Sequence, residues 1–241
     1  MDVVVVASRF NPDTGYVGER LTELGGNLRT VWLDKPETLH DAETRADLLL
    51  LMATGWSMLD PAWSREIAAE KALIRRALDR GVPMLAICFG AQVVASVLGS
   101  PVAPCSKPEI GWVSVDTDDA VICAPGPWFV FHRDMWIEKL QDPQVIPIAR
   151  SQLHPQAFRY GRTLAVQFHP EATDDIIDRW VSEEPARVAA AGVDVDELRA
   201  QSRSLAASAR ERGRNLVDTF LERIAGNDVV TGRSQKRWRA H

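Results

Sequence analysis

Cysteine is scarce in this chain. The 241 residues include only Cys88, Cys105 and Cys123, an odd number at wide intervals. No two of them form a CxxC pair, so the sequence has neither the usual ligand pattern of a structural zinc site nor a redox dithiol. We expect Cys105 and Cys123 to be structural thiols, and the cytoplasm, a reducing compartment, is the simplest location.

Long hydrophobic runs and an excess of positive charge are also missing. No apolar stretch approaches the ~20 residues of a membrane-spanning helix, and the first residues lack the basic segment of a secretion signal. The formal net charge of -5 disfavours a general nucleic-acid binder. We therefore expect a small-molecule substrate as ligand, with no membrane, nucleic acid or cofactor involved, and leave the oligomeric state open.

Hydrophobic residues make up 46% of the chain, enough for a large core. In the first part, short apolar runs alternate with helical periods. This alternation predicts a mostly parallel sheet covered by helices on both faces. Along the second helix, charged side chains are expected to point outward. Strands are predicted at residues 3–7, 28–33, 48–52 and 82–87, and helices at residues 16–24, 64–80 and 89–98.

The second part changes character. Short strands separated by turns predict small antiparallel additions to the sheet, and the chain then becomes helical. We expect an α/β domain over residues 1–175, helices packed on it over 176–228, and a flexible basic tail over 229–241. The strands are predicted at residues 110–115, 129–131, 145–149, 157–160 and 163–168, with a hairpin at 161–162, and the helices at 176–182, 195–212 and 214–225.

The most informative stretch is the abrupt end of an apolar run at Cys88. A buried strand, a tight turn with the cysteine at its tip and an immediate helix together form a nucleophile elbow. Gly90 would let that turn close without a Cβ clash. The helix start directs free N–H groups toward the sulfur, and this lowers a thiol's pKa. The alternative is an inert buried thiol, which is the commoner role of free cysteine.

A thiol nucleophile needs a base, and the base needs a group that orients it. Among the five histidines, His169 is the best candidate, because it ends an apolar strand and Glu171 follows two positions later. Alternate residues of a strand point the same way, so Glu171 could accept the N–H of one ring nitrogen and leave the other for Cys88. His132 and Asp134 alone make a poor metal site, and no metal is expected.

The motifs AICFGAQ (86–92) and QFHPE (167–171) resemble the nucleophile and His–Glu motifs of class I, triad-type glutamine amidotransferases. The segments EIGW (109–112), FHRD (131–134) and QAFRYG (156–161) extend the likeness, which covers roughly residues 1–175. These features are most similar to the stand-alone branch related to the amidotransferase domain of GMP synthase.

The resemblance implies a reaction. Cys88 would attack the side-chain amide of glutamine or of a γ-glutamyl compound, His169 would move the proton, and Glu171 would orient His169. Water would then hydrolyse the thioester. By the same resemblance, the backbone N–H groups of Phe89 and Gly55 form the oxyanion hole, and each such donor contributes about 3 to 4 kcal/mol to lowering the barrier.

The resemblance implies that Gln92, His132 and Asp134 bind substrate, and we expect Trp56 to line the pocket, with ordinary packing as the alternative. Two departures from the family pattern bear on them. The loop after the third strand reads Thr-Gly-Trp at residues 54–56, where the family usually has Gly-Gly-Pro, and Arg133 stands where the family usually has glycine.

Three functions remain open at this stage. The first is a glutaminase that passes ammonia to a partner synthase. The second is a stand-alone hydrolase of γ-glutamyl amides or peptides with the same triad. The third is a catalytically silent binding or regulatory protein, which the intact set of Cys88, His169 and Glu171 disfavours.

Overall fold

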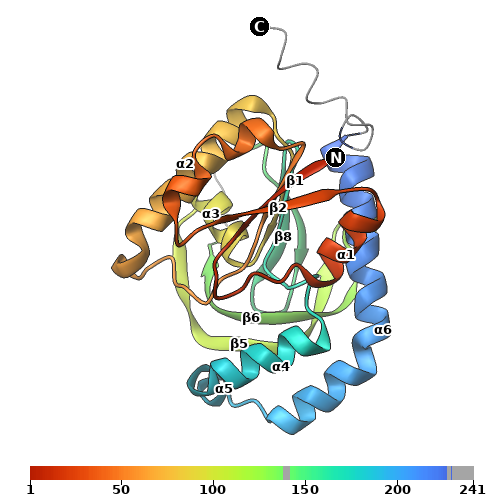
Figure 1. The fold of residues 1–241 in the computed structure, drawn as a ribbon. Coiled ribbons are helices and arrows are strands. Elements are labelled where there is room, and N and C mark those ends of the chain that lie inside the picture. The colour runs from red at the N-terminus through yellow and green to blue at the C-terminus, as the bar shows by residue number, and fades with distance from the viewer. Residues whose placement is uncertain (138–141, 227–228, 230–241) are drawn as a thin grey trace, which may run out of the picture.

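The computed structural model describes residues 1–137, 142–226 and 229 (Figure 1). The strands are β1 (Asp2–Ala7), β2 (Asn27–Trp32), β3 (Leu48–Leu51), β4 (Met84–Ile87), β5 (Val102–Thr117), β6 (Gly126–Trp136), β7 (Ile146–Arg150), β8 (Pro155–Tyr160) and β9 (Thr163–Val166). The α-helices are α1 (Gly15–Glu23), α2 (Ser64–Arg80), α3 (Phe89–Val97), α4 (Asp174–Glu183), α5 (Pro185–Ala191) and α6 (Val195–Phe220), and a π-helical turn, Leu221–Ala225, extends α6.

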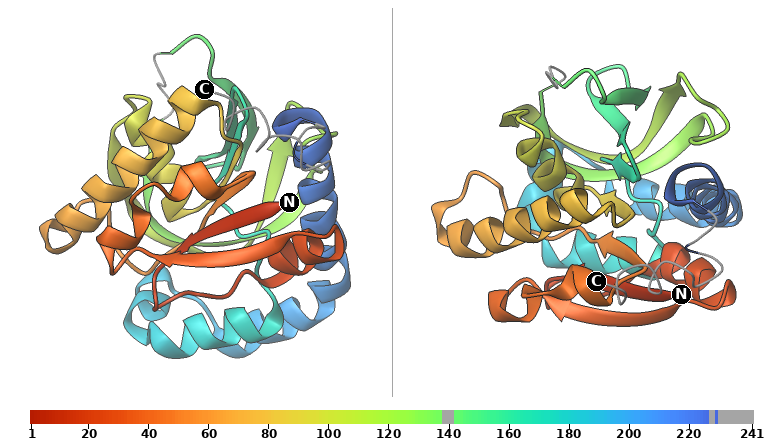
Figure 2. Two further views of the ribbon diagram at one scale, coloured as in Figure 1. Left: turned by 45° about the horizontal axis from the view of Figure 1, so that its top comes forward. Right: turned by 90° about the horizontal axis from the view of Figure 1, so that it is seen from above.

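One nine-stranded sheet has the order β2-β1-β3-β4-β9-β8-β7-β5-β6. The strands from β2 to β9 in this order pair in parallel, and those from β9 to β6 pair antiparallel. Figure 2 shows the antiparallel strands, in green, curling away from the first strands, in red and orange. The predicted α/β class is confirmed. Within the described ranges no helix is long and apolar enough to cross a membrane.

Each parallel strand contributes to two hydrophobic layers, because successive side chains of a strand point to opposite faces. Val3 and Val5 of β1 pack in one cluster with residues of α1 and α6. Val4 and Val6 pack in another with residues of α2 and α3. The continuous apolar runs of β3 and β4 follow from the same arrangement, since both of their faces are covered.

Strands β5 and β6 are much longer than predicted, whereas β9 is shorter and ends at Val166 rather than at residue 168. The segments expected at 110–115 and 129–131 are parts of β5 and β6, which pair from Val102↔Trp136 to Val115↔Gly126 with an irregularity between Pro104 and Glu109. Most of β5 is exposed or half-buried, so backbone hydrogen bonds, which leave no apolar pattern, hold much of its length. The hairpin predicted at 161–162 does join β8 to β9.

The C-terminal helices differ from the prediction at Gly213. Residues 195–220 form one helix rather than two, and α5 was not predicted. Gly213 serves a close approach, since a Cβ there would lie 2.5 Å from the carbonyl oxygen of Pro170. Helix α6 lies beside α1 (Figure 2), where Arg20 donates hydrogen bonds to both carboxylate oxygens of Asp218. Apart from Val229, the predicted tail 229–241 lies outside the described residues.

Helix α2 contains one charged residue that the prediction placed outside. Glu70 is fully buried on the face that also carries Ile67 and Ile74, and neither carboxylate oxygen has a hydrogen-bond partner among the described residues. Burial raises the pKa of Glu70 to about 8. The folded protein therefore keeps this carboxyl group neutral at pH values where the unfolded chain ionises it.

Replacing Glu70 with leucine is expected to stabilise the protein, and more so in alkali. Stability from a neutral Glu70 is complete below the unfolded pKa near 4.5 and is lost as the pH rises to about 8. At about 1.4 kcal/mol per unit of pKa, the loss amounts to several kcal/mol. Urea unfolding at pH 5 and pH 9 measures it. Glu70→Gln, which keeps the shape without the charge, should also flatten the pH dependence, and an equal gain at both pH values would contradict this account.

Candidate active site

Cys88 occupies the turn between β4 and α3. Its φ of 49° and ψ of -103° are unusual for a residue with a Cβ, and such strain is common at functional positions. A Cβ on Gly90 would lie 2.7 Å from the carbonyl oxygen of Leu51 on β3, so glycine allows the first turn of α3 to pack against that strand. The predicted nucleophile elbow is present, with the sulfur at the N-terminus of α3.

The register of β4 against β9 brings the second motif to the cysteine. Ile87 pairs with Val166, and the N–H of Cys88 donates to the carbonyl oxygen of Val166 over 2.7 Å. The next residue, Gln167, therefore lies directly beside the elbow. Its side-chain amide donates to Cys88 Sγ at 3.3 Å. Gln167 belongs to the second motif, but the sequence alone indicated no role for it.

His169 and Glu171 are paired, although for a different local reason from the one predicted. Strand β9 ends at Val166, and residues 169–172 form a turn closed by the N–H of Ala172 on the carbonyl oxygen of His169. Nδ1–H of His169 donates to Oε1 of Glu171 over 2.8 Å, and both side chains are buried. The turn, rather than the alternation of side chains along a strand, places the two side chains next to each other. Nε2 of His169 has no partner among the described residues.

Two opposing effects set the pKa of His169. Burial disfavours the imidazolium, but the negative charges of Glu171 and of a Cys88 thiolate outweigh it and raise the pKa of His169 to about 10. The folded protein therefore favours the charged imidazolium form of His169 at neutral pH. Burial instead raises the pKa of the Cys105 and Cys123 thiols to about 12, so both stay neutral, as structural thiols do.

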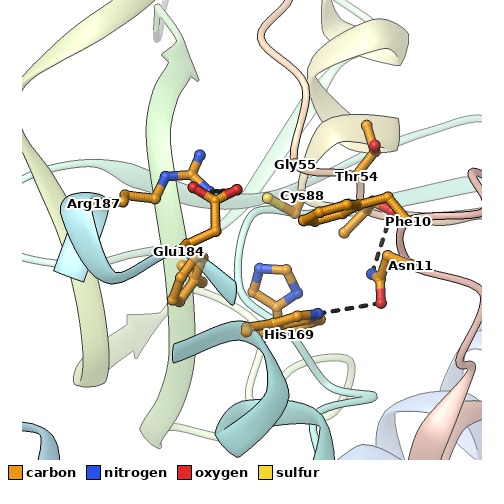
Figure 3. A pocket seen from close by; sticks show the side chains of 11 residues that line it. Phe10, Asn11, Thr54, Gly55, Cys88, His169, Glu184 and Arg187 are labelled. Atoms are coloured by element: carbon orange, nitrogen blue, oxygen red, sulfur yellow. Dashed lines mark hydrogen bonds and ion pairs between the residues drawn. The ribbon is translucent and has the colours of Figure 1, made fainter. Parts of the chain in front are cut away.

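Cys88 and His169 line one small cavity (Figure 3). Trp180 also lines it, with its ring 4.7 Å from that of His169 and its indole N–H donating to Asn11. Its walls come from segments far apart in the chain: Phe10 and Asn11 before α1, Ala53, Thr54 and Gly55 after β3, Phe131 of β6, Trp180 of α4, Glu184 between α4 and α5, and Arg187 of α5.

Of Gly55 and Phe89, the two predicted oxyanion donors, only Gly55 is among the described residues that line the cavity. Phe89 is the first residue of α3, where backbone N–H groups lack helical partners. Neither N–H donates a backbone hydrogen bond to another described residue. Arg133 donates to the carbonyl oxygen of Gly55 over 3.2 Å and so anchors the Thr-Gly-Trp loop. The two departures from the family pattern therefore contact each other.

Gln92 and Asp134, both predicted to bind substrate, are buried and lie outside the cavity lining. Gln92 donates to the backbone oxygen of Asp134 at 2.7 Å and to the side-chain oxygen of Gln167 at 3.2 Å. The carboxylate of Asp134 accepts from Ser57 at 2.5 Å. These hydrogen bonds hold the groups around the cysteine in place. Both residues therefore support the site without lining the cavity.

His132 and Trp56, the other two predicted substrate-binding residues, also lie outside this cavity. His132 is 1% exposed; its Nε2–H donates to Glu109 over 3.0 Å, and its Nδ1 lies 3.6 Å from Sγ of Cys105. Trp56 stacks on Trp63 with ring centroids 4.0 Å apart and lines an adjoining groove. Among the described residues, no group of acidic, histidine or cysteine side chains could hold a metal ion.

The polar residues that line the cavity away from the two motifs were not predicted. Asn11 lies in a loop, and Glu184 and Arg187 lie at the start of α5. Pro185 after an acidic residue was a usable signal for a helix start there. Nothing in the local sequence, however, indicates that this helix begins beside Cys88.

The sequence profile of the family described as glutamine amidotransferase class-I matches residues 16–179. The chain is similar to a glutamine-hydrolyzing GMP synthase of Aeropyrum pernix, with 27% identity over 182 residues that cover 69% of this chain and 33% of the relative. It is also similar to a glutamine-hydrolyzing GMP synthase subunit of Ignicoccus hospitalis, with 39% identity over 95 residues, 37% of this chain and 50% of the relative. The chain thus spans a third to a half of these relatives' lengths.

Solved structures share the fold. A glutamine amidotransferase from Thermotoga maritima superposes with a TM-score of 0.79 at 22% identity, covering 91% of this chain and 98% of that one. A glutamine amido transferase from Methylobacillus flagellatus gives a TM-score of 0.77 at 20% identity, covering 92% and 94%.

Proposed function

The chain belongs to the class-I glutamine amidotransferase family, and from this premise we propose that it hydrolyses the side-chain amide of glutamine through a thioester on Cys88. One observation carries the proposal. Cys88 and His169 line the same cavity and interact closely enough for Cys88 to raise the pKa of His169, and Glu171 accepts a hydrogen bond from the far side of the imidazole. Nucleophile, base and orienting group are thereby arranged as covalent catalysis requires.

In the first half of the proposed reaction, the Cys88 thiolate attacks the amide carbon of glutamine. The developing oxyanion accepts hydrogen bonds from the N–H groups of Gly55 and Phe89. Nε2–H of His169 gives its proton to the amide nitrogen, the carbon–nitrogen bond breaks and ammonia leaves. A thioester remains on the sulfur, and His169 is neutral.

In the second half, His169 takes a proton from a water molecule that attacks the thioester. The same N–H groups stabilise the second oxyanion, the carbon–sulfur bond breaks and glutamate leaves. Cys88 and His169 return to the thiolate and imidazolium forms. Throughout, Glu171 stabilises the charged imidazole and fixes its orientation. We propose further that the ammonia passes to a partner synthase, and the similarity to proteins named as GMP synthases supports this.

A second candidate is hydrolysis of larger γ-glutamyl amides without a partner. One feature favours it: a groove of about 450 Å³ adjoins the cavity and shares Phe10, Gly55 and Glu184 with it. The stacked rings of Trp56 and Trp63 line this groove. Such a surface suits a flat or apolar substituent on the amide nitrogen, a part that glutamine lacks.

The two candidates are separated by measuring turnover of the purified chain alone. Glutamine, γ-glutamylmethylamide and γ-glutamylbenzylamide are each supplied, and ammonia or amine release is followed. A glutaminase is expected to turn over glutamine faster than the other two substrates. Its rate should rise when a cell-extract fraction that contains the partner synthase is added. Brisk release of benzylamine with no partner would reject the glutaminase in favour of the hydrolase. No release from any substrate, with or without the partner fraction, would contradict both.

A further inference from the structure

The first turn of α5 presents two opposite charges to the cavity of Cys88. Glu184 and Arg187 both line it, and Figure 3 shows them on one side of Cys88 with Phe10 and Asn11 on the other. Neither residue lies in the motifs that carry the proposed chemistry. Because Cys88 and His169 supply the reacting groups, these two side chains are available for another task.

The two charges hold each other only loosely. Nη1 of Arg187 lies 3.8 Å from Oε1 of Glu184, which is too long for a hydrogen bond. Nε of Arg187 has no partner among the described residues, although the side chain is only 10% exposed. Burial lowers the pKa of Arg187, as expected for a charge whose hydration has been only partly replaced. Both side chains thus keep hydrogen-bonding capacity toward the cavity.

Arg187 is nevertheless held in position. Its guanidinium lies over the ring of Phe131, 5.1 Å from the centroid, and Phe131 itself lines the cavity. Pro185 opens the helix, and its fixed φ suits the first helical position. A rigid support of this kind is what a binding residue needs, because less conformational freedom is lost when the ligand arrives.

We propose that Glu184 and Arg187 bind the α-amino-acid end of the substrate, Glu184 its ammonium group and Arg187 its carboxylate. The inference rests on the proposed function and narrows it to γ-glutamyl compounds whose α-amino and α-carboxyl groups are both free. Three carbon–carbon bonds separate the amide carbon from the α-carbon, so an amide held at Cys88 places this end elsewhere in the same small cavity. A planar guanidinium pairs with a carboxylate through two parallel hydrogen bonds, and a carboxylate accepts from an ammonium group.

The test uses electrophiles that label the nucleophile, because labelling does not depend on a partner. Three chloromethyl ketones are compared: the analogue of glutamine, the same compound without its α-amino group, and the same compound without its α-carboxylate. The rate of covalent modification of Cys88 is followed by intact-mass and peptide mass spectrometry. Wild-type protein is expected to react with the complete analogue about 100-fold faster than with either truncated compound, since losing a charged partner leaves a buried group unpaired.

The variants then assign each charge to one group. Glu184→Gln should bring the complete and the amine-free compounds to within about 10-fold of each other while the preference for the carboxylate persists. Arg187→Met should do the reverse. Glu183→Gln and Arg203→Met, at exposed positions on neighbouring helices, are the matched controls and should behave as wild type. Thermal unfolding of each variant identifies any loss of fold, and Arg187→Lys then replaces Arg187→Met.

The outcomes separate this inference from the proposed function. Labelling of Cys88 at equal rates by all three compounds would overturn the proposal that Glu184 and Arg187 bind the α-amino-acid end. It would not contradict the thioester mechanism. An equal slowing of all three compounds in a folded variant would also overturn it, since a merely structural role predicts that. No labelling of Cys88 by any compound would overturn the proposed function and this inference together.

Discussion

Replacing Cys88 with alanine is expected to abolish ammonia release from glutamine, lowering kcat by at least about 10,000-fold. The thiolate forms the covalent bond of the proposed reaction, and no other described cysteine lines the cavity. Covalent labelling by a glutamine-like chloromethyl ketone should disappear in the same variant. The fold should survive, because alanine keeps the Cβ that the strained turn already accommodates.

The matched control for this experiment is Cys105→Ala. Cys105 is partly exposed, but burial raises the pKa of its thiol to about 12, so it should react slowly. The variant is expected to keep both ammonia release and labelling at wild-type rates. Peptide mapping that found the label on Cys105 or Cys123 in wild-type protein would contradict the assignment of the nucleophile.

Replacing Glu171 with glutamine is expected to lower kcat about 1,000- to 10,000-fold with little change in the fold. The carboxylate accepts from Nδ1–H of His169 and stabilises the imidazolium. An amide of the same shape removes that charge, so the pKa of His169 should fall from about 10 toward its ordinary value or below, because burial then acts with less opposition. NMR titration of the ring protons measures the shift, and kcat measures the catalytic effect.

The chain contains a second histidine–glutamate pair that serves as the control. Glu109 accepts from His132 over 3.0 Å, with both residues outside the cavity lining. Glu109→Gln removes a similar charge from a similar pair and is expected to change kcat by much less than Glu171→Gln. Equal losses in the two variants would indicate a general effect of carboxylate removal rather than the orientation of His169.

Much of the first part of the fold was predictable. The runs of valine and leucine in β1 and β3 have the length of buried strands, and the glycine after residue 80 marks the end of α2. Helix α2 agrees with the prediction at both ends. The prediction was wrong at positions where a residue has a different role from the usual one of its type. Glu70 is polar at a buried position, and Gly213 allows close packing where glycine more often ends a helix.

The sequence by itself determined the nucleophile elbow at Cys88 and the proposed base–carboxylate pair of His169 and Glu171. Each depends on residues close together in the sequence: a strand, a turn and a helix start in the first case, and two side chains two residues apart in the second. Short-range chemistry of this kind is encoded in adjacent residues and can be read from them.

Only the tertiary structure decided what surrounds the sulfur. Gln167 reaches Cys88 because β4 and β9 are neighbours in a particular register. Gln92 lies outside the cavity lining, and its side-chain amide donates to the backbone oxygen of Asp134 on β6. Glu184 and Arg187 face the cavity because the start of α5 packs beside the elbow. These relations join segments that lie far apart in the chain through burial and hydrogen bonding, and no local pattern of residues carries them.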